Sequence, residues 1–419
     1  GASYQDISYT YGIPFHGEEH GEHEEEGHDG DHEGEEHDDD HEGEEHHDEH
    51  EGERIFSSTD SEVFTIQGLI NVNSTLLNTV EFSIRDTDYT LVEQHAEGDG
   101  EDEHEDEHEA HSEEPTLFSN DATEVQMIFN LGSAESPRRI VVNQVSEEVA
   151  VLGEEAFMEP VKSTETTIGA FGGFDVSGFD IDVGIRYDDI EREGTIREMH
   201  EEEEHEEEGH EDEGHDDEHE SFELEPFTFK DQSVSGVVTI GRSLTDSLSG
   251  SVNMGFVTRT PSAMELFMNG EHLAVARYEV GDANLKVEES NNIDLNLFYN
   301  DETWFASASI YRNTIDNYIY LRDESEEEHE EHEEEGHEGE HEEHGGLLLA
   351  EYMQADATFS GYEIEIGRRF NFAGGELEVR LHRDQVKADF SGGGNVPRIT
   401  PSRNVFAMDY SRGVTRAMI

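Results

Sequence analysis

One stretch near the start of the chain consists almost entirely of acidic residues, histidine and glycine. It spans residues 16–53 and reads HGEEHGEHEEEGHDGDHEGEEHDDDHEGEEHHDEHEGE. A segment without apolar side chains cannot offset the entropy lost on ordering, so we expect it to be disordered without bound metal. Shorter versions recur at residues 94–114, 199–220 and 324–344. These four acid/histidine tracts are too polar to form a core, so the sequence between them must supply the fold.

The composition excludes nucleic acid as a partner and favours cations. It has 107 Asp and Glu against 24 Lys and Arg, a formal net charge of −83. Nucleic-acid binding is excluded because phosphate needs Lys and Arg, whereas a negative field attracts cations. The chain has no cysteine, so neither a disulfide framework nor a thiolate metal site is available.

Histidine is confined to the tracts. Of the 26 histidines only His272 and His382 lie outside them. Imidazole suits zinc, copper, iron and nickel, whereas carboxylates alone suit calcium and magnesium. The irregular spacing and many glycines predict many weak, mobile sites for a divalent ion, zinc first. The predicted tract ligands are His16, His20, His23, His28, His32, His37, His41, His46, His47, His50, His104, His108, His205, His210, His215, His329, His332 and His337.

Two other interpretations of the tracts remain. Acidic runs can be solvated loops or an adaptation to salt, which accounts for Asp and Glu but not for the confinement of histidine. A calcium-binding surface is also compatible with the carboxylates, yet calcium does not select imidazole.

The sequence between the tracts alternates with the two-residue period of β-strands. In residues 179–185 (FDIDVGI) and 362–367 (YEIEIG), apolar side chains alternate with acids or glycine. Roughly fourteen such strands, joined alternately by short and long connections, predict an all-β, transmembrane antiparallel β-barrel. All four tracts fall on long connections, so we expect them to emerge at one end of the barrel. A soluble β-sandwich is the alternative, although it has no reason to segregate its loops.

Residues 259–292 carry a motif of a known family. The segment RTPSAMELFMNGEHLAVARYEVGDANLKVEESNN resembles the extracellular connection of TonB-dependent outer-membrane receptors. The pieces ADATFSGYEIEI and VPRITPSRN are similar to later strands of that family, with Thr400 in place of a proline. The zinc-receptor branch is the most similar, through YGIP at 11–14, GEEAFMEP at 153–160 and NGEH at 269–272, where Glu271 replaces a proline.

The resemblance implies an architecture and a location. Residues 1–419 would be part of a barrel of about 22 strands with a plugged lumen. The family's plug domain, its TonB box and its last strands have no counterpart in the sequence, so we expect an incomplete barrel. The resemblance also implies a monomer in the lipid of the bacterial outer membrane, with extracellular loops and energy from the TonB–ExbB–ExbD system.

His272 is the sharpest candidate ligand. The resemblance implies that its loop faces the substrate vestibule, where His272 with Glu279, and with Glu265 and Glu271 nearby, would form an ordered metal site. The alternative is that His272 is simply an exposed loop residue without a metal-binding role. His382 lies within a predicted strand and is interpreted as facing the lumen or as structural. The sequence shows no catalytic constellation, so neither an enzyme nor a catalytic cofactor is expected.

The first hypothesis is therefore a TonB-dependent receptor that imports zinc or a similar divalent metal, with the tracts capturing the ion. The rival is a barrel at the cell surface that buffers metal, or adheres through calcium, and transports nothing.

Acid should weaken metal binding by the tracts. Protons compete with the metal for imidazole, so the zinc affinity of the purified chain should fall as the pH is lowered from 7.5 to 5.5. Isothermal titration at the two pH values measures the change. Tight binding retained well below the imidazole range would count against histidine ligation.

Overall fold

The structure is a computed structural model that describes residues 1–12, 55–72, 74–95, 115–133, 136–153, 156–199, 222–272, 275, 277–324 and 347–419. Within these residues, fourteen strands have ten or more residues: β1 (Ala2–Gly12), β2 (Ile55–Asn71), β3 (Leu77–His95), β4 (Thr116–Ser133), β5 (Ser136–Leu152), β6 (Val161–Val176), β7 (Phe179–Met199), β8 (Phe222–Ser243), β9 (Leu248–Arg259), β12 (Glu288–Asn300), β13 (Trp304–Asp323), β14 (Leu348–Phe372), β15 (Gly375–Phe390) and β16 (Arg403–Arg412).

Short elements complete the described part of the chain. They are the helix α1 (Ala263–Phe267) and the four-residue strands β10 (Asn269–His272), β11 (Arg277–Val280) and β17 (Thr415–Met418). None of the helices in the described residues is long and apolar enough to cross a membrane.

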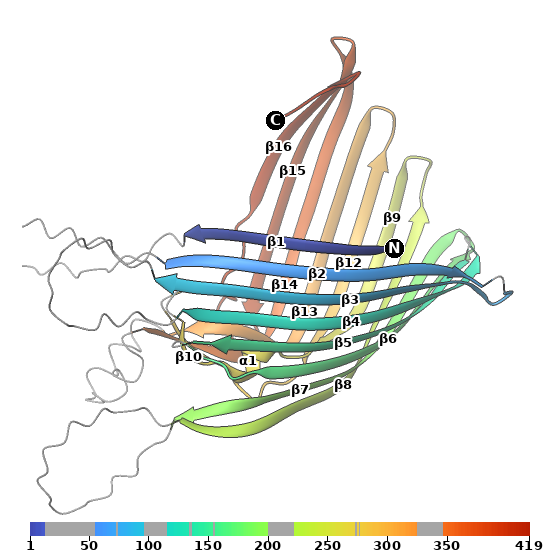
Figure 1. Cartoon of the computed structure of the whole chain (residues 1–419). Coiled ribbons are helices and arrows are strands. Elements are labelled where there is room, and N and C mark those ends of the chain that lie inside the picture. Colours follow the sequence, from blue (N-terminus) through green and yellow to red (C-terminus); the bar gives the residue numbers. More distant parts are fainter. Residues whose placement is uncertain are drawn as a thin grey trace, which may run out of the picture.

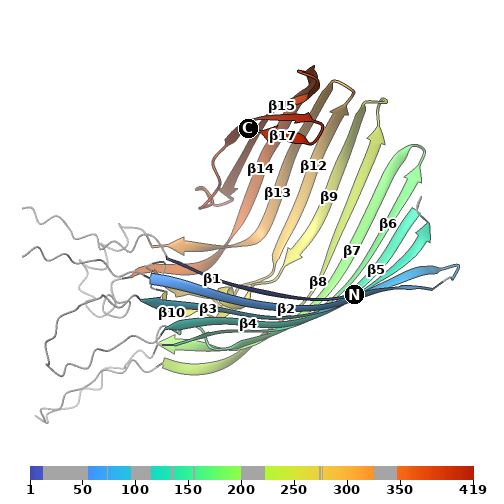
Figure 2. The ribbon, with the colours of Figure 1, turned by 45° about the horizontal axis from the view of Figure 1, so that its top comes forward.

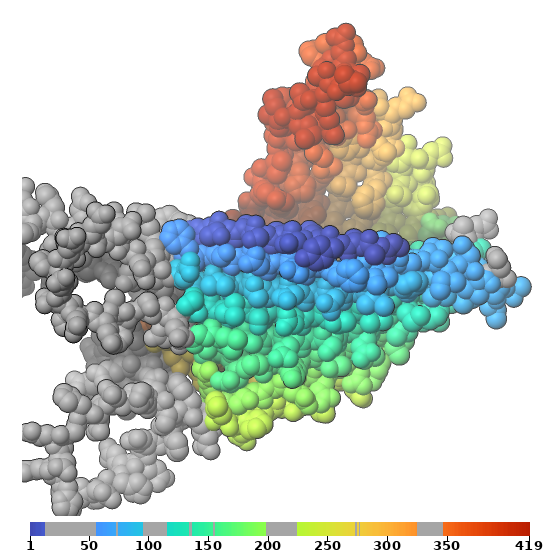
Figure 3. Space-filling model, in the orientation of Figure 1, coloured from blue at the N-terminus to red at the C-terminus, as the bar shows by residue number. Residues whose placement is uncertain are grey.

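The strands form one 17-stranded sheet. Each strand from β1 to β9 pairs antiparallel with the next, β9 pairs with β12, and the order then continues to β17. The sheet is strongly curved: β9 to β16 rise away from the wall made by β1 to β8 (Figures 1 and 2). In the space-filling view β1 lies along the edge of that wall (Figure 3). The prediction of an antiparallel all-β fold with about fourteen main strands is confirmed.

The four tracts leave the sheet at one end. The strands that flank them are paired to their last residues, as in Gly12 with Phe56, Met199 with Phe222 and Asp323 with Ala350. The short connections, such as those after Val176 and Phe372, lie at the opposite end (Figure 1). This arrangement confirms the prediction that all four tracts are attached at the same end.

The two faces of the sheet differ in what they carry. We call the face on which α1 lies the inner face and the opposite one the outer face. A Cβ on Gly194 of β7 would lie 2.7 Å from a ring carbon of Phe267 in α1, which places Gly194 on the inner face. Because side chains alternate along a strand, Val183 and Ile185 of β7 point outward, and both are exposed. Exposed apolar side chains on an outer face are typical of membrane-spanning strands.

A small core fixes the long connection between β9 and β12 to the inner face. Phe267 and Leu266 of α1 are each only 2% exposed, and they pack with Phe157, Met158 and Val161. Phe227 and Phe229 of β8 border the same cluster. The connection between β9 and β12 is therefore held in a fixed position on the inner face, at the end of the sheet to which the tracts are attached.

Replacing Phe267 by Ala should release this connection. Removing a fully buried phenyl ring costs about 3–5 kcal/mol, and α1 has only five residues to hold it otherwise. Limited proteolysis should then cleave within residues 260–287 much faster than in the wild type. Met264→Ala on the same helix, whose side chain is only partly buried, is the matched control and should have a smaller effect. Equal cleavage of F267A and wild type would contradict this packing.

Candidate metal site on the inner face

Ion pairs anchor the start of the connection that carries His272. Arg259, the last residue of β9, donates to the carboxylates of Glu288 at 2.7 Å and Glu265 at 2.9 Å. Glu265 also accepts a hydrogen bond from the backbone N–H of Ser262, whose hydroxyl in turn accepts from the N–H of Glu265. This capping box begins α1. Glu265 therefore has structural partners in this arrangement.

A second connection, residues 153–160, supports the turn after α1. The backbone N–H of Asn269 donates to the carbonyl of Phe157 at 2.8 Å, and the Asn269 side chain donates to the carbonyl of Arg197 at 2.7 Å. Gly270 has φ +153°, and a Cβ there would lie 2.9 Å from the Cβ of Phe157. A glycine is needed at this position because the two connections approach so closely. The motifs at 153–160 and 269–272 thus meet in space.

A short hairpin brings His272 and Glu279 together. Within the pair of β10 and β11, His272 lies opposite Arg277, and Gly270 lies opposite Glu279. Directly opposed residues share a face, so His272 and Glu279 are diagonal neighbours on one side of the hairpin. His272 Nδ1 lies 3.8 Å from Glu279 Oε1, and the two side chains are 19% and 10% exposed.

The imidazole of His272 is held in an apolar setting. Its ring centroid lies 5.0 Å from that of Phe157 and 5.9 Å from that of Phe118. Nδ1 is buried and has no hydrogen-bond partner among the described residues. A buried nitrogen without a hydrogen-bond partner costs free energy, and so does a buried negative charge that is not neutralised. A cation bound between the two groups would satisfy both.

The other predicted ligands of this site lie elsewhere. Glu271 is opposite Tyr278 and therefore lies on the other face of the hairpin from His272, while Glu265 belongs to the Arg259 network. Within the described residues no group of three or more His, Asp or Glu side chains is arranged to hold a metal ion. The structure therefore brings together two of the four residues, His272 and Glu279.

The tract histidines predicted as ligands, from His16 to His337, all lie outside the described residues. The second histidine outside the tracts, His382 on β15, lies 3.6 Å from Asp384 Oδ1. Ala388 and Phe390 of the same strand pack with Val396 of the 391–402 connection, which lies on the inner face. By alternation His382 also faces inward, as expected for a lumen-facing residue.

The β10–β11 hairpin contacts the residues that flank the fourth tract. β11 pairs in parallel with β14, so that Arg277 lies beside Leu348, close to where that tract ends. Asp323, just before the tract begins, accepts from Arg277 at 2.9 Å and from Arg398 at 3.2 Å. These pairings could not be predicted, because parallel contacts between distant segments leave no local pattern in the sequence. The aromatic walls Phe118 and Phe157 were also missed.

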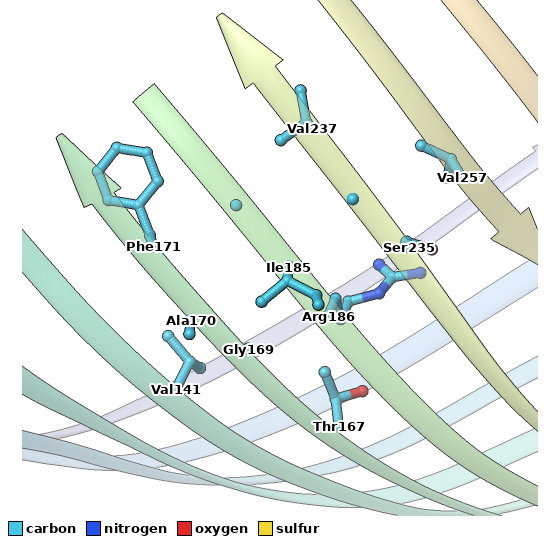
Figure 4. A pocket seen from close by; sticks show the side chains of 12 residues that line it. Val141, Thr167, Gly169, Ala170, Phe171, Ile185, Arg186, Ser235, Val237 and Val257 are labelled. Carbon is cyan, nitrogen blue, oxygen red and sulfur yellow. The ribbon is translucent and has the colours of Figure 1, made fainter. Parts of the chain in front are cut away.

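A hollow on the inner side of the sheet differs in chemistry from the His272 site. It has a volume of about 400 Å³ and is lined by Val141, Phe171, Val237 and Val257, with Thr167 and Arg186 at one side (Figure 4). Glycines at 169 and 184 leave the space open. Its lining contains no histidine and no acid, so it is not a metal site.

Comparison with known proteins identifies the architecture. A family model described as "TonB dependent receptor-like, beta-barrel" matches residues 144–416. The structure is similar to the copper transporter OprC, with a TM-score of 0.60 and 15% identity, over 87% of this chain and 54% of that one. It is also similar to a double mutant of the Serratia marcescens hemophore receptor HasR in complex with its hemophore HasA and heme, with a TM-score of 0.53 and 10% identity, over 87% of this chain and 64% of that one.

A third similar structure is the FrpB iron transporter from Neisseria meningitidis (F5-1 variant), with a TM-score of 0.50 and 12% identity, over 85% of this chain and 49% of that one. The chain thus spans about half to two thirds of the length of these proteins. The matched family model covers well over half of the 419 residues. The chain therefore belongs to the TonB-dependent receptor β-barrel family, whose members are outer-membrane transport proteins.

Proposed function

We propose that this protein is a TonB-dependent receptor that imports zinc or a similar divalent transition metal. The observation that carries the proposal is the pairing of His272 with Glu279 on the inner face, with a buried Nδ1 that has no partner among the described residues. In this proposal the tracts are extracellular, the protein acts as a monomer, and the TonB–ExbB–ExbD system supplies the energy.

The distance between the two side chains suits a shared ion. In tetrahedral zinc the ligand bonds are about 2.0–2.2 Å, which separates neighbouring nitrogen and oxygen ligands by about 3.3 Å. The observed separation of 3.8 Å closes to this value with a small side-chain rotation. Two protein ligands leave coordination positions for water or for other donors, as expected for an ion that must be released again.

The type of ligand argues for the class of ion. A nitrogen and a carboxylate oxygen, without sulfur, suit zinc and other divalent transition metals, whereas calcium takes six to eight oxygens. The copper, iron and heme proteins similar in structure share only the fold at 10–15% identity, so the choice of ion rests on the ligands. Zinc remains the first choice because a mixed nitrogen and oxygen ligand set suits a borderline divalent ion.

The position of the tracts supports capture followed by selection. All four are attached at the end of the sheet that carries the His272 hairpin, and one begins directly after Asp323 and ends before Leu348, close to β11. Weak tract sites would raise the local concentration of ions at this end. The His272 and Glu279 pair would then select among these ions.

Removing either ligand should lower uptake of the ion. In cells expressing the complete gene, H272A and E279Q should reduce energy-dependent accumulation of radioactive zinc by about tenfold or more, since loss of a ligand weakens metal binding at least that much. A protonophore separates energy-dependent uptake from surface binding. H382A is the matched control, because it removes the other histidine outside the tracts and should leave uptake unchanged. Surface-bound zinc without energy-dependent uptake in the wild type would favour the metal-buffering rival.

Calcium should not compete for the selective site. Purified wild type should bind zinc more tightly than H272A, and this difference should persist in a large excess of calcium. Copper(II) should displace the zinc bound at this site, because copper binds such ligands more tightly than zinc. Competition titrations with both proteins measure this difference. Competition by calcium as effective as that by copper would point instead to a calcium-dependent surface protein.

A further inference from the structure

Three arginines near the short-turn end of the sheet stack on aromatic rings. The guanidinium carbon of Arg138 on β5 lies 5.6 Å from the ring centroid of Phe174. Arg242 on β8 lies 4.6 Å from the ring of Phe179. Arg368 on β14 lies 4.9 Å from the ring of Trp304, the only tryptophan in the chain, and 4.7 Å from that of Phe370. Each arginine lies within a few residues of a short turn.

All three arginines face outward. Val149 and Val151 of β5 pack in the inner core, so Arg138 points to the other side. Phe229 of β8 borders the same core, which places Arg242 outward by the same alternation.

The outer face continues across the sheet to β14 through directly paired residues. Ile185 pairs with Gly236, Gly236 with Phe256 and Phe256 with Asn291. Ile293 and Leu295 share the face of Asn291 on β12, and Leu295 pairs with Ile310, which pairs with Tyr362. Arg368 has the parity of Tyr362, Ile364 and Ile366 and is therefore outward as well.

These arginines lack carboxylate partners. In a chain with 107 acidic residues, none of the three forms an ion pair within the described residues, and all three are exposed. Most other arginines of the sheet do pair, as Arg259 does with Glu288. An outward guanidinium that is stacked on a ring and left without an acid is placed to meet an anion from outside the protein.

The charge of the outer face changes along the strands. Nearer the tract-bearing end, Glu62, Asp88, Asp121 and Glu148 lie in one directly paired row across β2 to β5. Exposed apolar residues such as Ile84, Ile185 and Ile364 lie between this row and the short turns. The outer surface is thus acidic toward the tracts across β2 to β5, apolar in the middle, and carries the three arginines toward the short turns.

We propose that Arg138, Arg242 and Arg368 form a binding girdle for anionic phospholipid headgroups, one phosphate at each arginine–aromatic pair. A guanidinium binds phosphate through two parallel hydrogen bonds, and an aromatic ring beneath it suits the boundary between headgroup and acyl chain. The apolar belt next to the girdle receives the acyl chains. A phospholipid is the occupant that fits both features, because it presents a phosphate next to hydrocarbon chains.

The girdle would also fix the position of the protein in the membrane. Headgroups held at the short-turn end set the depth of the apolar belt, and the acidic row at the other end disfavours the same anionic lipids. The short turns would then lie at a phospholipid surface, with the tracts on the opposite side. This consequence is independent of which ion the protein transports.

Trp304 provides a direct test, because it lies under Arg368 and is the single tryptophan of the chain. The full chain is reconstituted into phosphatidylcholine vesicles that contain either brominated phosphatidylglycerol or brominated phosphatidylcholine, and tryptophan quenching is compared at equal mole fractions. Wild type should prefer the anionic lipid by about two- to fivefold, as expected for one arginine at a membrane surface. R368Q should bring the ratio close to one, and R368K should retain most of the preference.

The adjacent Arg369 is the matched control. It stacks on Phe305 at 4.7 Å but has the opposite parity and faces inward, so R369Q should leave the lipid preference unchanged. The strand signal in circular dichroism shows whether each variant is folded, and R368K provides the answer if R368Q is not. Absence of quenching by either lipid, a wild-type ratio of one, or an equal loss in R369Q would overturn the proposal.

Discussion

Backbone pairing between consecutive antiparallel strands is the constraint on which the rest of this structure depends. It makes each strand end where its neighbour begins, so every second connection emerges at the same end of the sheet. The four tracts contain too few apolar residues to form a core, and this parity attaches all four of them at one end of the sheet. The same pairing sets side-chain alternation, which gives the sheet an apolar outer face and an inner face that holds α1.

Much of the fold could be predicted from the sequence because its signals are local. Alternation in residues 179–185 and turn residues such as those at 177–178 marked strands and their ends, although most strands extend further than the alternating stretch indicated. The short strands β10 and β11 were not predicted, since they occur within a connection and depend on contact with β14. Such contacts between distant segments have no periodic signature.

In the candidate site, too, the residues could be predicted from the sequence but the contacts between distant segments could not. His272 and Glu279 could be chosen from the sequence, because His272 lies outside the tracts and the family resemblance implies that its loop faces the substrate vestibule. Their closeness depends on hairpin register, and the apolar setting depends on Phe157 from a connection more than a hundred residues earlier. Glu265 was included for its proximity in sequence, whereas the capping box and Arg259 give it a structural role.

We propose that His272 and Glu279 hold the ion that the protein transports. Anomalous diffraction at the zinc edge, from crystals of the zinc-loaded protein, would locate that ion. An anomalous peak is expected within about 2.0–2.2 Å of both His272 Nδ1 and a Glu279 carboxylate oxygen. Zinc peaks elsewhere, with the His272 ring still packed between Phe118 and Phe157 and no metal at Nδ1, would contradict it.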